Sequence, residues 1–87
     1  MNAKIKRYAK ERDEMLQKCS VDELKKFMKK YEHCYEKGFV DAFNNASELV
    51  QKATLHKMIV NVPKLPKELR AKSMLWLVTH GMGTDIC

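Results

Sequence analysis

The sequence predicts an all-α fold: a single domain, residues 1–87, that forms a compact bundle of three to four helices. Apolar residues recur at helical spacing along most of the chain, and its three glycines and two prolines fall at the ends of these periodic segments. A content of 45% hydrophobic and 32% charged residues is typical of a globular chain. Because a domain of this size buries only about 60–65% of the surface of its unfolded form, its own core is modest and self-association is one way to complete it. Helices are expected over about residues 2–18, 20–37, 39–61 and 66–80.

The first half of the chain carries two of these helices. Arg12 is the one charged residue within the apolar arc of the first. Ser20 is typical of a helix N-cap, and Glu23 three residues later completes a capping box that starts the second. Gly38 then either turns the chain or bends one longer helix. The expected inward faces are formed by Ile5, Tyr8, Ala9, Met15, Leu16 and Cys19 in the first helix and by Leu24, Phe27, Met28, Tyr31, Cys34 and Tyr35 in the second.

The second half carries two more helices. An apolar stripe runs from Phe39 to Ala53 on one face, and after Thr54 the apolar residues change to the opposite face. This change fits a kink near Thr54, a helix buried on two sides, or a second face that meets a partner. Pro63 disfavours helical geometry in the residue before it, and Pro66 suits the start of the last helix. Gly81 is a favourable residue for a left-handed cap after that helix.

The predicted core draws on all of the helices. Cys19 and Cys34 lie on apolar arcs and are expected there as small core residues. With Cys87 they make an odd number of cysteines without framework spacing, which predicts free thiols and a cytoplasmic location. The sequence shows neither a long apolar run nor a charged-then-apolar leader, so no membrane span or signal peptide is predicted. The other core residues are predicted to be Leu24, Phe27, Tyr31, Phe43, Ala46, Val50 and Leu77.

No motif in the sequence predicts catalysis, a cofactor or a metal site. The patterns of nucleophile elbows, phosphate loops and zinc proteases are missing, and the histidines and cysteines lack the close pairing of zinc ligands. The run "GMGTD", residues 81–85, resembles the core of the annexin calcium loop. Such a site also takes a carboxylate from a later helix, and no later helix is expected within these residues. We therefore predict a helix terminus here instead of a calcium site.

A net charge of +6 makes nucleic acid a candidate partner, because lysine and arginine side chains neutralise phosphates. Acidic residues are interleaved on the same helix faces, however, so an ordinary solvated surface is the competing interpretation. The aromatic residues fall on apolar arcs, and no exposed stacking platform is predicted. The residues expected to contact phosphates under the nucleic-acid hypothesis are Lys25, Lys26, Lys29, Lys30, Lys67 and Arg70.

The last helix gives the strongest indication of function, because it is apolar on nearly all sides. A short helix cannot bury every side within a monomer of this size, which favours a surface completed by another chain. Trp76 is the expected anchor of that surface, since tryptophan is enriched in interface hot spots, or else it fills the core of the bundle. We predict a non-enzymatic protein that binds another protein, with a homodimer as a further possibility, and that occludes or bridges a surface of its target. The predicted partner-binding residues are Trp76, Leu69, Met58, Ile59, Met74 and Met82.

The runs "TLHKMIVNV" and "LPKELRAKSMLWL", within residues 54–80, resemble small uncharacterised helical proteins carried by phages and mobile elements of low-GC bacteria. The resemblance implies a compact protein that acts by binding, such as an anti-CRISPR-like inhibitor of a host defence complex or a small regulator of transcription or replication. A host complex is therefore the expected partner. The resemblance carries no diagnostic motif, so no site residue follows from it.

Overall fold

The computed structural model describes residues 3–83, and this part of the chain is helical without any strand. The predicted all-α fold is confirmed. Five α-helices and one short 3-10 helix are present in the described range, instead of the three to four helices expected. They are α1 (Ala3–Gln17), α2 (Val21–Lys30), η1 (Glu32–Cys34), α3 (Phe39–Asn45), α4 (Glu48–Val60) and α5 (Lys67–Thr79).

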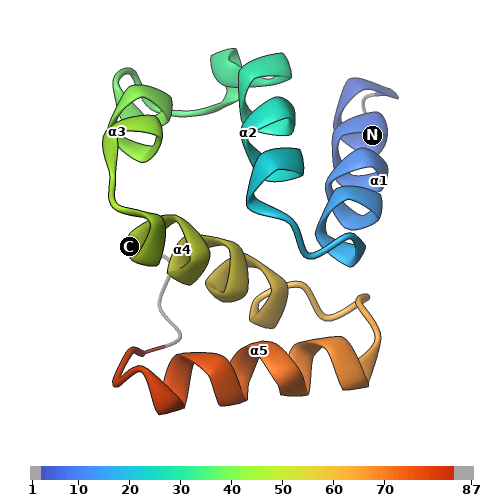
Figure 1. The fold of residues 1–87 in the computed structure, drawn as a ribbon. Helices are drawn as coiled ribbons and strands as arrows, with labels where there is room; N and C mark the ends of the chain where they lie inside the picture. Colours follow the sequence, from blue (N-terminus) through green and yellow to red (C-terminus); the bar gives the residue numbers. More distant parts are fainter. Residues whose placement is uncertain (1–2, 84–87) are drawn as a thin grey trace.

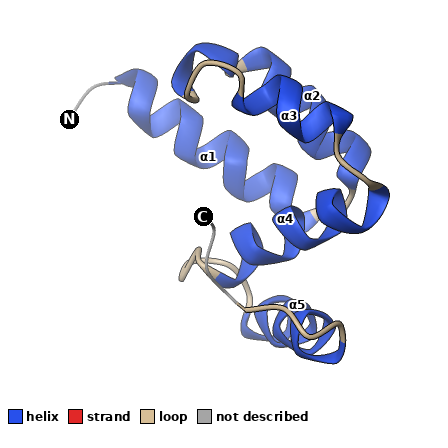
Figure 2. Cartoon of the chain, turned by 90° about the vertical axis from the view of Figure 1, so that its left-hand side faces the viewer, coloured by secondary structure: helices blue, strands red, loops and turns tan. Residues whose placement is uncertain are grey.

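Helix α4 lies at the centre of the arrangement (Figure 1). One of its sides packs against α1, α2 and α3, and α5 packs along another, antiparallel to it. The view turned by 90° shows α5 nearly end-on, apart from the first three helices (Figure 2). Of the explanations for the apolar switch in residues 39–62, a helix buried on two sides therefore describes α4, and α4 continues past Thr54 to Val60 without interruption.

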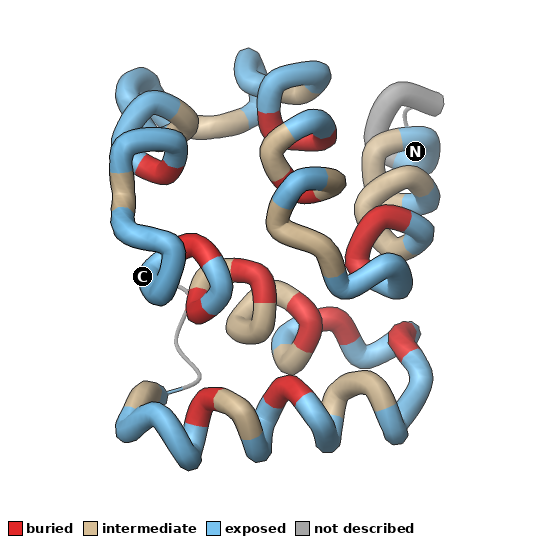
Figure 3. Tube along the Cα trace, in the orientation of Figure 1, coloured by how far each residue is buried: buried red, intermediate tan, exposed pale blue. Residues whose placement is uncertain are grey.

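The core lies mainly where α1, α2 and α3 meet α4 (Figure 3). Four of the predicted core residues are buried: Leu24, Phe27, Phe43 and Leu77. Tyr31 and Ala46 are half-buried, while the prediction for Val50 is wrong, since 48% of its surface is exposed. The other buried apolar residues are Met15, Leu16, Met28, Ala53, Leu55, Ile59, Val62 and Leu65.

Val50 is exposed because the helix expected over residues 39–61 is broken in two. Ala46 is extended, with ψ 162°, and Ser47 begins a new helix as its N-cap, its hydroxyl accepting a hydrogen bond from the Val50 N–H at 3.3 Å. The apolar stripe of the first helix therefore does not continue into the second. Gln51 bridges the break, because its side-chain nitrogen donates to the Phe43 carbonyl at 2.9 Å and to the Asn44 carbonyl at 3.4 Å.

Both cysteines expected in the core are exposed, so that prediction is also wrong. Cys19 lies in the turn after α1 with a left-handed φ of 50°, just before the Ser20 N-cap. Helix α2 ends at Lys30 instead of near residue 37, and Cys34 falls in the 3-10 helix that follows it. A 3-10 helix has about three residues per turn, so the apolar arc of α2 does not extend to Cys34. Gly38, with φ 85°, lies in a turn before α3 and does not bend a longer helix.

Two of the predicted caps are confirmed. The Ser20 hydroxyl accepts a hydrogen bond from the Glu23 N–H at 3.4 Å. At the end of α5, Gly81 has φ 68° and its N–H bonds to the Val78 carbonyl at 3.0 Å, while the Met82 N–H bonds to the Leu77 carbonyl at 2.8 Å. This is the Schellman pattern, so the glycine ends a helix as expected. Thr84, Asp85 and Cys87 lie outside the described residues.

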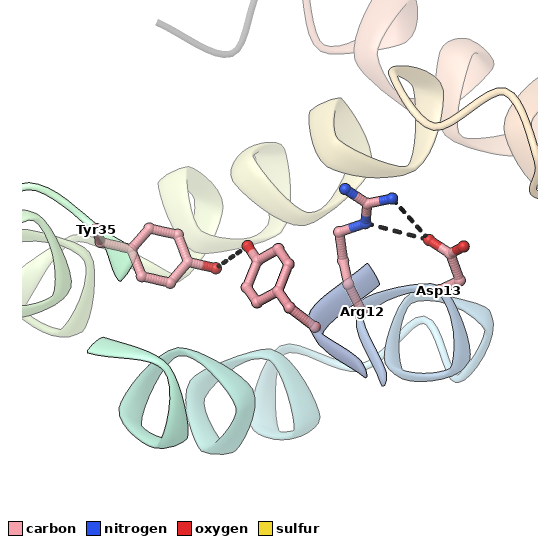
Figure 4. A network of polar contacts seen from close by, with 4 residues as sticks. Arg12, Asp13 and Tyr35 are labelled. Atoms are coloured by element: carbon pink, nitrogen blue, oxygen red, sulfur yellow. Dashed lines mark hydrogen bonds and ion pairs between the residues drawn. The ribbon is translucent and has the colours of Figure 1, made fainter. Parts of the chain in front are cut away.

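One polar contact joins α1 to the segment that follows α2, and another lies within α1 (Figure 4). The hydroxyl groups of Tyr8 and Tyr35 lie 3.2 Å apart, and burial together with this bond raises the pKa of Tyr35 well above its usual range. Arg12, the charged residue in the apolar arc of α1, donates to the carboxylate of Asp13 at 3.0 Å. Its charge is thereby paired at the edge of the core.

Candidate protein-interaction surface

Helix α5 packs chiefly against α4, so only one of its sides is covered. Ser73 and Leu77 are buried on that side, and Leu69 packs against the edge of the core. The Ser73 hydroxyl bonds to Nδ1 of His56 on α4 at 2.9 Å, which satisfies a polar group at the helix contact. The opposite side of α5 faces away from the rest of the described protein (Figure 3).

Four apolar residues form a continuous row on this outward side: Ala71, Met74, Leu75 and Val78, named here the α5 strip. Their spacing of i, i+3, i+4 and i+7 places them on one face of the helix. The exposed fractions are 40% for Met74, 64% for Leu75 and 63% for Val78, and Ala71 is exposed as well. A single exposed apolar residue is ordinary in a soluble protein, but a contiguous row is typical of an interaction surface.

The charges of α5 are confined to its first half. Lys67, Glu68, Arg70 and Lys72 fall there, and Arg70 donates to the Leu65 carbonyl at 3.2 Å across the loop between α4 and α5. From Ser73 to Gly83 the sequence contains no lysine, arginine, aspartate or glutamate. Helix α5 is therefore basic at its N-terminal end, and no lysine, arginine, aspartate or glutamate follows Lys72 in it.

Trp76 does not belong to the strip but lies on the flank of α5. Its ring stacks on two imidazoles, and the distances between ring centres are 4.5 Å to His56 and 4.0 Å to His80. Burial, with smaller contributions from His80 and Lys52, lowers the pKa of His56. A protonated His56 would therefore be disfavoured in this stack at neutral pH.

The same ring borders a cleft of about 600 Å³ between the α1–α2 turn and α4. Cys19 and Lys25 line one wall of this cleft, and Lys52 and His56 line the other. Trp76 is thus half-buried and accessible from the cleft, so it neither fills the core completely nor projects as a free anchor. The cleft is a second surface on which a target has access to an aromatic ring.

Apart from Trp76, the predicted partner-binding residues fall in three environments. Met74 lies on the strip, and Met82 is half-buried just after the cap of α5. Met58 and Leu69 pack against the core, and Ile59 has no exposed surface, so it is a core residue and unavailable to a partner. The sequence-based set omitted Ala71, Leu75 and Val78, although their spacing marks them as one face of the last helix.

The lysines of the nucleic-acid hypothesis do not form one surface. Those of α2 and those of α5 lie on separate helices with α4 between them (Figure 1). On α2, Lys30 pairs with Glu11 at 2.9 Å and Lys26 lies 4.0 Å from Glu23, while Lys25 lines the cleft and Lys29 is exposed. A hydrogen bond from the Tyr31 hydroxyl, followed by the contacts with Lys30, holds the pKa of Glu11 below its usual value. The carboxylate therefore stays charged and opposes part of the basic surface.

Within residues 3–83, no group of three or more histidine, cysteine, aspartate or glutamate side chains is placed to hold a metal ion. In the same range no helix combines the length and the apolar character needed to cross a membrane. No family model, curated protein or solved structure matches the chain. The surface chemistry of the described residues is therefore the basis for a functional proposal.

Proposed function

We propose that this chain is a non-enzymatic protein-binding protein and that the α5 strip is its principal contact surface. The observation that carries the proposal is the outward row of Ala71, Met74, Leu75 and Val78 on a helix whose second half has no charged residue. Burying a leucine, valine or methionine side chain contributes about 1.5–3 kcal/mol each before the costs of association are subtracted. A protein partner is the occupant that gains most from such a row.

The mode of action in this proposal is steric, since the strip and the neighbouring cleft offer contact surface without a catalytic constellation. When this protein is bound to its target, it would cover or bridge a surface of that target. The proposed target is a host complex, with this protein as its inhibitor or regulator, which is what a relation of residues 54–80 to small helical proteins of phages and mobile elements would imply.

A photo-cross-linking amino acid tests the proposal in the cells that make the protein. Placed at position 75, on the strip, it is expected to yield a covalent adduct with a protein. The matched control places it at position 50, where Val50 is also an exposed apolar residue but lies on α4 away from the strip. Equal labelling at both positions, or no adduct at position 75, would contradict the proposal.

The competing hypothesis is a regulator that contacts nucleic-acid phosphates through lysines. It predicts binding to unrelated DNA or RNA that weakens steeply with salt and is lost in the Lys26→Glu, Lys30→Glu double variant. We expect this double variant to keep its cross-linking at position 75, because neither lysine belongs to the strip. Salt-sensitive binding that disappears in the double variant would instead favour the nucleic-acid hypothesis.

A further inference from the structure

We infer that the occupant of the α5 strip is a second copy of this chain, packed through α5 in an antiparallel, two-fold symmetric pair. The inference rests on the proposed function, because it takes the strip to be a protein-contact surface, and it names the partner. Two features of α5 support it: the order of side chains along the strip and the distribution of charge along the helix.

The strip is complementary to itself when the two helices run in opposite directions. In a pair centred between residues 74 and 75, Ala71 of each copy lies opposite the partner's Val78, so a small side chain meets a larger one at each end. Near the two-fold axis, Leu75 meets the partner's Leu75 on one side and Met74 meets the partner's Met74 on the other. Small residues let helix axes approach within about 8–10 Å, and the flexible methionines fill the remaining gaps.

The charges of α5 favour this direction of pairing. Lys67 continues the strip at the N-terminal end of the helix. In the antiparallel pair it lies near the C-terminal end of the partner's α5, where the helix dipole is negative and residues 73–83 supply no lysine or arginine. A parallel pair would place the two Lys67 side chains together and bring the basic halves of both helices side by side. Like charges placed side by side in this way destabilise the contact.

The small size of the contact surface favours weak association. A helix of 13 residues is about 20 Å long, and one such helix from each copy gives a contact at the small end of specific interfaces. We therefore expect a reversible dimer with a dissociation constant on the order of micromolar. The cleft beside Trp76 lies on the flank of α5, so each copy in the pair would keep its cleft open to a target.

Sedimentation equilibrium of the full chain tests the inference. It is carried out over a wide range of concentration with a reducing agent, because Cys19 and Cys34 are exposed. The average mass of the wild-type protein is expected to rise with concentration from that of one chain, 10.2 kDa, toward twice that mass. Leu75→Glu places two carboxylates side by side at the two-fold axis, and Val78→Glu places one opposite each Ala71, so both variants are expected to remain at the mass of one chain.

The matched control is Val50→Glu, which changes an equally apolar exposed residue of α4 to the same charge and is expected to associate like wild type. An unchanged helical circular dichroism spectrum in all three variants shows that the fold is retained. Wild type that remains monomeric at every concentration would overturn the inference, as would association that survives both strip variants.

The two proposals fail in different ways. If wild type is monomeric and the cross-linker at position 75 captures a different protein in cells, the self-pairing is wrong and the protein-binding function stands. If wild type is monomeric and position 75 captures nothing, both are wrong. An adduct between two copies of the chain, together with a concentration-dependent dimer, supports the self-pairing and the strip as a protein-contact surface, and a host complex would then be contacted through the cleft beside Trp76.

Discussion

At the scale of single residues, Leu75 and Leu77 show how position on a helix decides the role of a side chain. They lie two positions apart on α5, yet Leu77 has no exposed surface and Leu75 is among the most exposed apolar residues of the described chain. Residues two apart in a helix point about 200° away from each other. One leucine therefore holds α5 against α4, and the other faces outward.

The stability of the two alanine variants is expected to differ accordingly. Leu77→Ala leaves a cavity at the α4–α5 contact and should lower the free energy of unfolding by about 2–5 kcal/mol, whereas Leu75→Ala should change it by less than about 0.5 kcal/mol. Urea unfolding at a low protein concentration, where self-association does not contribute, measures both. Similar losses in the two variants would show that α5 does not dock through Leu77.

His56 predicts a pH dependence of stability. Its pKa in the folded protein lies below the unfolded value of about 6.5, chiefly because burial disfavours the imidazolium. Below that pH the unfolded chain binds more protons than the folded chain does, so the contribution of His56 to stability is full above about pH 6.5, falls as the pH drops, and levels off below the folded pKa. Denaturant unfolding between neutral and mildly acidic pH should show a smaller loss in His56→Gln. If the free energy of unfolding changed equally with pH in the wild type and the variant, His56 would not be the cause of the pH dependence.

At the scale of secondary structure, the helix ends separate what sequence reasoning could find from what it could not. Ser20 was predicted because it stands between two clear apolar periods, and Gly81 because it follows the last one. The break at Ser47 was missed because the stripe from Phe39 to Ala53 runs across it at helical spacing. Asn44, Asn45 and Ser47 are residues that favour helix ends, and this cluster was the available signal.

Gln51 compensates for that break and should be sensitive to substitution. Gln51→Ala removes the hydrogen bonds to the Phe43 and Asn44 carbonyls, while the Phe43 carbonyl keeps its bond from the Ala46 N–H. The loss of an ordinary hydrogen bond costs about 0.5–1.5 kcal/mol. The neighbouring Lys52→Ala is the control, since it removes only an exposed ion pair with Glu48. Equal urea midpoints for wild type and Gln51→Ala would contradict the bridging role.

At the scale of the whole molecule, the interaction surface depends on how α5 docks. The apolar residues on nearly every side of the last helix were the reason to predict a surface beyond the core, and that surface stays a prediction. Which side remains outward depends on the packing of Ser73 and Leu77 against α4, a tertiary contact that helical periodicity does not specify. For this reason the sequence left two roles open for Trp76, the anchor of a partner surface or a residue that fills the core, whereas its ring stacks on His56 and His80.

The arrangement also explains why so small a chain would benefit from a partner. Helix α4 is covered on two sides, but α5 is covered on one only and lies at the edge of the described structure (Figure 2). Pairing two copies through α5 would give this helix a second covered side. The pair would then have α5 helices at its centre and the α1–α3 regions at its outer ends.

Disulfide trapping tests this central claim most directly. In a chain whose native cysteines are replaced by serine, a single cysteine at position 75 lies beside the two-fold axis, while single cysteines at positions 67 and 50 lie far from their counterparts. Because a disulfide requires Cα atoms within about 7 Å, mild oxidation should link copies through position 75 and leave the chains with a cysteine at 67 or 50 as monomers. Cross-linking through position 67 as well would indicate a parallel pair, and no preference for position 75 would contradict the proposal that α5 joins two copies.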